Sequence, residues 1–178
     1  MATRHALVSL AALLLAVAPM ARAAEKLVKP GEVIADKSLP KAARERMVQA
    51  ALRYDTFWST GDESLARAAL APAFKDNTLP PGRPQGVEGP IAASKMFRSA
   101  VPDLTCDVDQ LIVSGDRVVA LLHFKGHFTG EAHGKKGTGQ MVDFIATDIY
   151  RIVNGRIVED WHLEDNLTLL KQLGVVQP

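Results

Sequence analysis

The chain has 178 residues, of which 47% are hydrophobic, 23% are charged and 6% are aromatic, and its formal net charge is +1. These proportions are those of one globular domain, and they exclude disordered, collagen-like and strongly basic nucleic-acid-binding proteins. The single cysteine, Cys106, excludes an intrachain disulfide framework and a cysteine-rich metal site.

The first residues have the three parts of a secretory signal peptide. Arg4 and His5 begin it, Ala6–Ala18 is apolar apart from one serine, and Ala21-Arg22-Ala23 has small residues around its centre. This apolar run is shorter than the roughly 20 residues of a spanning helix, so we expect no stable membrane span. Cleavage after Ala23 would leave 19 basic and 20 acidic residues, and the product would be periplasmic or secreted. The alternative is an N-terminal core helix.

The mature chain begins with expected helices. Residues 24–40 are polar, contain Pro30-Gly31 and predict a flexible leader; Ser38 and Pro40 then suit a helix start. The helix ends at Gly61, and a second one begins after Asp62 and reaches Pro72. A loop rich in proline and glycine follows at residues 77–90, and residues 91–100 form a third helix before Pro102.

Beyond Pro102 the apolar residues recur every second position, which is typical of strands. Expected strands cover residues 104–113, 117–128, 141–153 and 156–163, followed by a closing helix over residues 166–173. Asn154-Gly155 favours a tight hairpin, because both residues tolerate positive φ. Helices followed by an antiparallel meander predict one α+β domain over residues 41–178.

Several short motifs follow one another through this domain. They are Gly86-Val87-Glu88-Gly89, Val101-Pro102-Asp103-Leu104, Gly115-Asp116-Arg117-Val118-Val119, Gly126 to Gly130, Asp148-Ile149-Tyr150-Arg151, Asn154-Gly155-Arg156-Ile157-Val158-Glu159, Trp161, Asp165 and Gln172-Leu173-Gly174. Their order and spacing resemble those of the SnoaL-like polyketide cyclase, or ester cyclase, family. The resemblance implies a nuclear transport factor 2-like cone, in which helices pack on a curved antiparallel sheet around a pocket.

The resemblance implies a catalytic role for Asp165. In these cyclases an aspartate four residues after the tryptophan is the acid/base of an intramolecular aldol reaction, and Asp165 has this spacing from Trp161. If the last strand is regular, Trp161, Leu163 and Asp165 share one face, with Trp161 as a wall of the pocket. The alternative role for Asp165 is the N-cap of the closing helix.

Two histidines are further candidates. Family members carry a Gly-x-His-x-Gly stretch, whereas this chain has His127 one position early and Phe128 in the expected place. Strand alternation turns His127 to the face opposite Phe128, unless a bulge restores its direction. His162 has a similar problem, because it is out of phase with Trp161 and Asp165; it is either a pocket group or a solvated strand histidine.

Other candidates come from the first helix and the loop after it. Tyr54 and Trp58 form an aromatic row that is either core or a wall against a ligand. Asp76 and Asn77 either face the cavity or begin the loop as turn formers. The histidine spacings do not suit a metal site on strands, and no cofactor motif is present, so we expect neither metal nor cofactor.

These observations lead to an exported pocket protein that acts as a cofactor-independent cyclase, isomerase or hydrolase on a small hydrophobic carbonyl compound. The alternative is a non-catalytic periplasmic module that binds a small ligand. We expect no nucleic-acid partner, and the open sheet face of such folds also suggests a homodimer.

Overall fold

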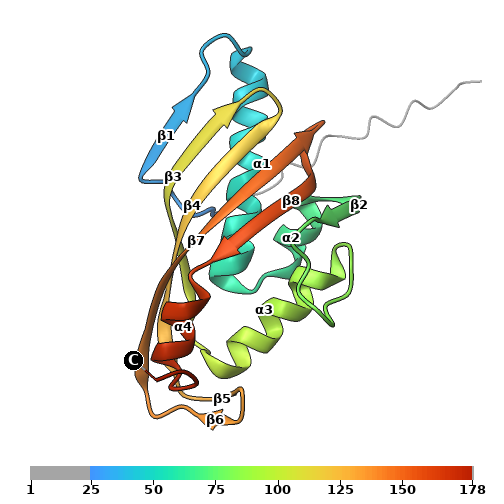
Figure 1. The fold of residues 1–178 in the computed structure, drawn as a ribbon. Coiled ribbons are helices and arrows are strands. Elements are labelled where there is room, and N and C mark those ends of the chain that lie inside the picture. Colours follow the sequence, from blue (N-terminus) through green and yellow to red (C-terminus); the bar gives the residue numbers. More distant parts are fainter. Residues whose placement is uncertain (1–24, 178) are drawn as a thin grey trace, which may run out of the picture.

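The computed structural model describes residues 25–177, and the predicted signal peptide therefore lies outside the described residues. The fold is α+β, as predicted (Figure 1). Its elements are β1 (Glu32–Ala35), α1 (Lys41–Thr60), α2 (Glu63–Ala69), β2 (Leu70–Asp76), α3 (Glu88–Ala100), β3 (Thr105–Ser114), β4 (Arg117–Phe128), β5 (Glu131–Ala132), β6 (Lys135–Lys136), β7 (Gln140–Val153), β8 (Arg156–Glu164) and α4 (Asn166–Gln172).

One curved sheet organises the domain. Its six strands lie in the order β1-β3-β4-β7-β8-β2, and β5 with β6 forms a separate small hairpin. The four long strands pair antiparallel, while β1 and β2 add parallel to the two edges. Figure 1 shows α1 behind the upper part of the sheet, with α3 and α4 around its lower part. The curved sheet and its helices form the predicted cone.

Helix α1 supplies much of the packing against the sheet. It buries the apolar face that its helical spacing predicts, including Met47, Ala50 and Tyr54. It ends where Gly61 takes a left-handed conformation with a φ of 76°, which costs glycine little because it has no side chain. The predicted start at Ser38 is two residues early, since Pro40 is the N-cap.

The two edge strands are absent from the sequence-based expectations. Residues 70–76 form β2, where the sequence predicted the end of a helix and the approach to a loop. Part of the expected flexible leader forms β1, whose Val33 pairs with Leu111 of β3. Both strands are short and parallel to distant segments, so no local hairpin signal marks them.

The phase of β8 changes near its start. Ile157 pairs with Ile152, but Glu159 pairs with Arg151, so Val158 is an extra residue on this strand. Such a bulge shifts the alternation by one position. Consequently Ile157 and Asp160 are both buried, and the even-numbered residues that follow face the inside of the cone. The expectation that Trp161, Leu163 and Asp165 share the pocket face is therefore wrong.

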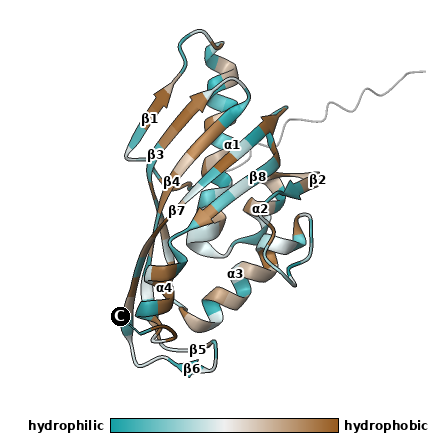
Figure 2. Ribbon diagram, viewed as in Figure 1, coloured by the Kyte–Doolittle hydropathy of each residue, from teal (hydrophilic) through white to brown (hydrophobic). Residues whose placement is uncertain are grey.

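Strands β4 and β7 keep a regular alternation. Even-numbered residues from Val118 to Phe128 are buried, and those from Val142 to Ile152 are buried on the same side. Figure 2 shows the resulting mixture of apolar and polar residues along the strands. Among the described helices, none is long and apolar enough to cross a membrane.

Candidate active site

A cavity of about 610 Å³ opens between the sheet and the helices α1, α3 and α4. Aromatic rings cover much of its wall. Trp58 meets the ring of Phe124 edge to face at 6.2 Å, and Phe124 stacks on Phe144 at 5.2 Å between centroids. Phe97 continues the band 5.9 Å from Phe144. This part of the cavity therefore suits a flat or apolar ligand.

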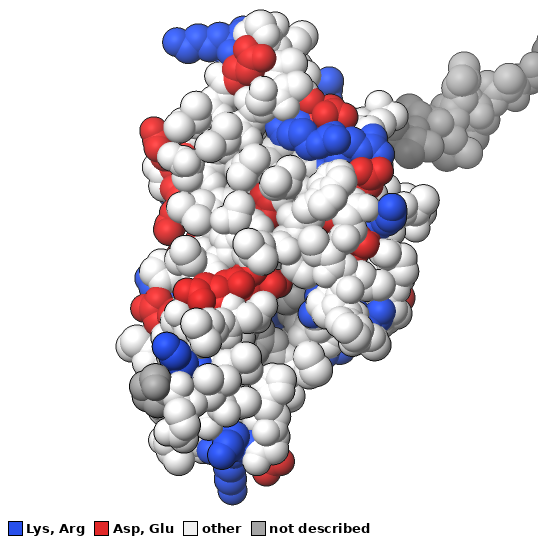
Figure 3. All heavy atoms as spheres, in the orientation of Figure 1, with Lys and Arg blue, Asp and Glu red and all other residues white. Residues whose placement is uncertain are grey.

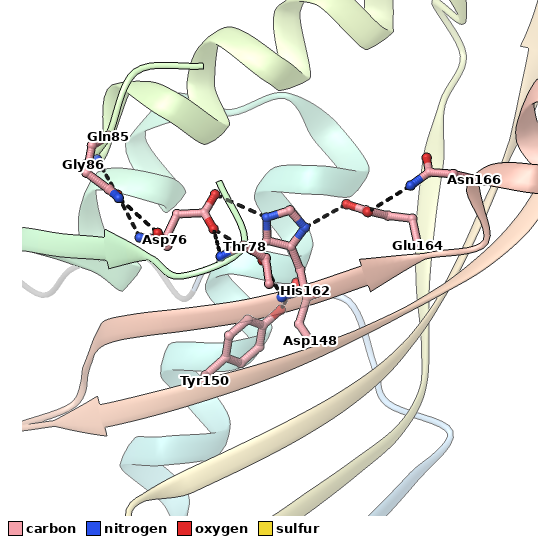
Figure 4. A network of polar contacts seen from close by, with 9 residues as sticks. All are labelled: Asp76, Thr78, Gln85, Gly86, Asp148, Tyr150, His162, Glu164 and Asn166. Atoms are coloured by element: carbon pink, nitrogen blue, oxygen red, sulfur yellow. Dashed lines mark hydrogen bonds and ion pairs between the residues drawn. The ribbon is translucent and has the colours of Figure 1, made fainter. Parts of the chain in front are cut away.

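The other end of the cavity is polar and is organised by His162. Its Nε2 atom lies 3.1 Å from Oδ2 of Asp76, and its Nδ1 atom lies 2.8 Å from Oε1 of Glu164 (Figure 4). A neutral imidazole donates from one nitrogen only, so two carboxylate partners favour the protonated ring. The side chains of His162 and Asp76 are only 10% and 5% exposed, so their contact lies away from bulk water, whereas Glu164 is 33% exposed.

Local structure holds the three residues of this network in place. His162 and Glu164 follow the bulge of β8 on the same face, whereas Asp76 ends β2 alongside that strand. The backbone N–H of Asp76 donates to Gln85 Oε1 at 2.7 Å, and Gln85 Nε2 donates back to the Asp76 carbonyl at 2.9 Å. Thr78 also donates its N–H to Oδ1 of Asp76. The proline-rich loop thus holds Asp76 in place, so that its carboxylate contacts His162.

Asp148 lies opposite His162 on the neighbouring strand. The two residues are direct partners in the antiparallel pairing of β7 and β8. Asp148 is only 5% exposed, and its Oδ2 accepts a hydrogen bond from the Tyr150 hydroxyl at 2.9 Å. A second carboxyl, Asp55 of α1, lies 2.8 Å from the same hydroxyl.

The Tyr150 hydroxyl has one proton and two carboxyl neighbours. It cannot donate to Asp148 and Asp55 at once, so one carboxyl must carry a proton and donate to the phenol oxygen. Burial raises the pKa of Asp55 well above its usual value, and Asp55 is fully buried. The consistent assignment is a neutral Asp55 that donates to Tyr150, which in turn donates to Asp148.

Burial also decides the protonation of the site groups. It raises the pKa of Asp148 to about 7, although the positive charge of His162 and the hydrogen bond from Tyr150 oppose this shift. Burial by itself lowers the pKa of His162, but the hydrogen bond to Glu164 and the charges of Glu164, Asp76 and Asp148 raise it to about 9. At neutral pH the site therefore pairs a carboxyl that readily exchanges protons with a stable imidazolium.

Four of the residues singled out from the sequence line the cavity. Tyr54 and Trp58 of α1 belong to its wall, and Asp76 and His162 belong to its polar end. The aromatic row is thus both core and cavity wall, because Tyr54 is buried while it borders the open space. Asp76 faces the cavity, and its carboxylate also accepts a hydrogen bond from the Thr78 N–H, as expected of a turn-forming aspartate.

The structure places the other predicted residues outside the cavity lining. Asp165 is exposed and caps α4, where its carboxylate accepts hydrogen bonds from the Thr168 N–H and hydroxyl. Trp161 faces the outer side of the sheet, with the guanidinium carbon of Arg117 5.5 Å from its ring centre. The bulge in β8 is the physical reason, since it turns Trp161 outward and His162 inward.

The sequence also directed attention to His127, Phe128 and Asn77. His127 lies on the outer face, as its parity predicts, and its Nδ1 contacts Oδ2 of Asp103 at 2.7 Å. Phe128 is fully buried in the core beyond the lining of the cavity. Asn77 donates its backbone N–H to the Asp160 carbonyl and so joins β2 to β8 without lining the cavity.

Four carboxyl groups of the cavity were missed from the sequence: Glu131, Asp148, Asp160 and Glu164. For Asp148 a signal was present, because it occupies the same parity as the buried residues Ala146 and Tyr150. Asp160 and Glu164 carry no comparable signal, since their direction depends on the bulge.

Comparisons with known proteins agree with this architecture. The sequence profile of the family described as SnoaL-like polyketide cyclase matches residues 48–173. No curated protein matches the chain. A crystal structure named as a proposed polyketide cyclase from Bacillus cereus is 42% identical, with a TM-score of 0.78, and the match covers 86% of this chain and 97% of that one.

Two structures from Streptomyces are also similar. TsrD from Streptomyces laurentii is 29% identical with a TM-score of 0.67, over 78% of this chain and 99% of that one. IdmH, named as a proposed polyketide cyclase from Streptomyces antibioticus, is 28% identical with a TM-score of 0.65, and the match covers 72% of this chain and 98% of that one. Each of the three matches takes in most of this chain.

Proposed function

Because the chain belongs to the SnoaL-like polyketide cyclase family, we propose that it catalyses acid/base chemistry of the cyclase or isomerase type on a small hydrophobic carbonyl compound. The observation that carries the proposal is the pairing of Asp148 with His162 at the polar end of an aromatic cavity. In this proposal the proton-transfer role expected of Asp165 passes to Asp148, since Asp165 caps a helix outside the cavity.

The proposed reaction begins with Asp148 as the base. Its carboxylate takes a proton from the carbon next to a carbonyl group, and the electron pair of that C–H bond forms an enolate. The imidazolium of His162, held between Asp76 and Glu164, stabilises the negative charge that develops on the enolate oxygen. In a cyclase the enolate carbon then attacks a second carbonyl of the same molecule, and the alkoxide that forms takes back a proton.

The charge of the cavity favours an uncharged substrate. At the polar end the carboxylates of Asp76, Asp148 and Glu164 are largely balanced by two cations, the imidazolium of His162 and the guanidinium of Arg83, so no large excess charge attracts a charged ligand there. Aromatic rings at the other end remove apolar surface of the ligand from water. A neutral aromatic or polycyclic ketone suits both the polar end and the aromatic end of the cavity.

Proton exchange tests this proposal without knowledge of the natural substrate. The enzyme is incubated with phenylacetone in D₂O, and deuterium incorporation next to the carbonyl is followed by NMR. We expect D148N to reduce the enzyme-dependent rate by about 100-fold or more, because general-base catalysis contributes about 10² to 10⁴. The matched control is D165N, an aspartate outside the cavity, which retains the wild-type rate. Loss of exchange in D165N with retention in D148N would return the role to Asp165.

We further propose that the protein is exported and that the mature chain begins at Ala24. The support comes from the charged start, apolar run and small-residue motif of residues 1–23. Export would place the substrate outside the cytoplasm, where the cavity meets compounds that enter or leave the cell.

A further inference from the structure

A buried carboxyl group in the cavity lining lacks a hydrogen-bond partner. Among the described residues 25–177, five buried side-chain atoms have none: they belong to Asp55, Asn77, Ser94, Arg98 and Asp160. Only Asp160 among these residues lines the cavity. Asp160 is 1% exposed, so bulk water does not satisfy its Oδ1 atom.

A buried carboxyl group without a hydrogen-bond partner lowers the stability of the folded protein. Burial of a polar group without a hydrogen bond destabilises the folded state, and burial of the charged form does so much more. Burial, together with the negative charges of Asp148 and Asp76, raises the pKa of Asp160 well above its usual value. Both effects favour the neutral carboxylic acid, whose O–H is a hydrogen-bond donor.

The position of Asp160 relates it to the proton-transfer groups. It pairs directly with Tyr150 across β7 and β8, and it lies two residues before His162 on the same face. In the parallel pairing of β2 and β8 it also lies opposite Asp76. An oxygen atom of a ligand held near Asp148 and His162 is thus within the same small polar region as the Asp160 carboxyl.

We propose that Asp160 is a ligand-binding residue whose neutral carboxyl donates a hydrogen bond to an acceptor oxygen, the carbonyl oxygen of an uncharged ketone. In this role the ligand supplies the hydrogen-bond acceptor that the protein itself does not provide for Asp160. The same donor would strengthen its hydrogen bond as the carbonyl becomes an enolate, since negative charge then grows on that oxygen. The inference rests on the proposed function only for the class of ligand, because it concerns binding and not turnover.

The first test compares two ligands of the same shape, 2-indanone and indane, which differ in the carbonyl oxygen. Calorimetry gives the ratio of their dissociation constants in the wild type, D160L and D160N. We expect the preference for the ketone to fall by about tenfold in D160L, the usual effect of one hydrogen bond. D160N should keep much of the preference, since its amide N–H is also a donor.

The second measurement separates this role from a structural one. Leucine removes the unsatisfied carboxyl, so D160L should unfold at a higher temperature than the wild type although it binds the ketone less selectively. The carbonyl stretch of ¹³C-labelled 2-indanone should lie at lower frequency in the wild type than in D160L. A residue that only supports the fold would lower the melting temperature and leave the stretch unchanged.

Several outcomes overturn the inference. They are an equal ketone preference in the wild type and D160L, absence of ketone binding to the wild type, and an Asp160 carboxyl that NMR shows to be ionised at pH 7. Tighter binding of 2-aminoindane than of 2-indanone would instead identify a cation site. The two proposals fail separately: the proposed function fails if D148N retains the wild-type rate of proton exchange, and this inference fails if D160L retains the wild-type ketone preference.

Discussion

At the scale of single residues, the site depends on carboxyl groups that burial brings into different protonation states. Burial favours the neutral form of Asp55 and Asp160, whereas the pKa of Asp148 is raised only to about 7, where it readily exchanges a proton. The difference follows mainly from the positive charge of His162, which favours the charged form of Asp148. The cavity thereby contains a base, Asp148, a neutral hydrogen-bond donor, Asp160, and a cation, His162.

The pH dependence of proton exchange should report these groups. The base form of Asp148 appears as the pH rises through about 7, so the rate increases there; His162 loses its proton at about 9, so the rate then falls. In H162Q the falling limb disappears. The rising limb moves to higher pH, because the positive charge that lowers the pKa of Asp148 is gone. Exchange measured from pH 5 to 10 checks both limbs, and a flat wild-type profile would contradict the assignment.

At the scale of elements, one inserted residue decides which face of β8 enters the cavity. The bulge at Val158 exchanges the roles of the odd and even positions, and so His162 replaces Trp161 on the inner face. The strand then ends, and Asp165 begins α4 as its cap. Asp165 thus has an ordinary structural reason to be an aspartate.

The cap should contribute to stability and not to chemistry. We expect D165A to lower Tm by about 2–4 °C, because the Thr168 N–H loses its acceptor, while D165N leaves Tm nearly unchanged since asparagine caps equally well. Thermal unfolding followed by circular dichroism measures both variants. If D165A unfolds at the wild-type temperature, the capping contact is not stabilising.

At the scale of the whole molecule, the sheet has one face toward the cavity and another that several apolar side chains leave exposed. The most exposed of these on the long strands are Leu163, Met141 and Ile145. Figure 3 shows one side of the molecule, where charges of both signs are scattered and acidic atoms gather near the junction of β8 and α4. The homodimer expected from this face stays a prediction.

The predicted export can be tested on the isolated protein. Its sheet, helices and cavity are built from residues 25–177. If residues 1–23 are removed as their sequence predicts, protein isolated from the native host should have the intact mass of a chain that begins at Ala24, and a recombinant chain with that start should have the proton-exchange activity. Intact-mass spectrometry checks the first point. A mass that includes residues 1–23 would contradict cleavage.

Much of this protein follows from its sequence alone. Local patterns determined α1 and its left-handed end at Gly61, the alternation of β4 and β7, and the tight turn at Asn154 and Gly155, where both residues have positive φ. These features depend on neighbours in the chain, so residue type and spacing suffice to predict them. The same spacing of motifs was enough to indicate the family.

The tertiary structure alone decided the edge strands and the chemistry. β1 and β2 pair with segments far away in the chain, and the bulge of β8 is set by its register against β7. Burial of Asp55, Asp148 and Asp160 likewise depends on which elements cover them, and burial is the first cause of their raised pKa values. Sequence supplied the acidic residues, but only packing distant segments together removes them from water and makes them different from one another.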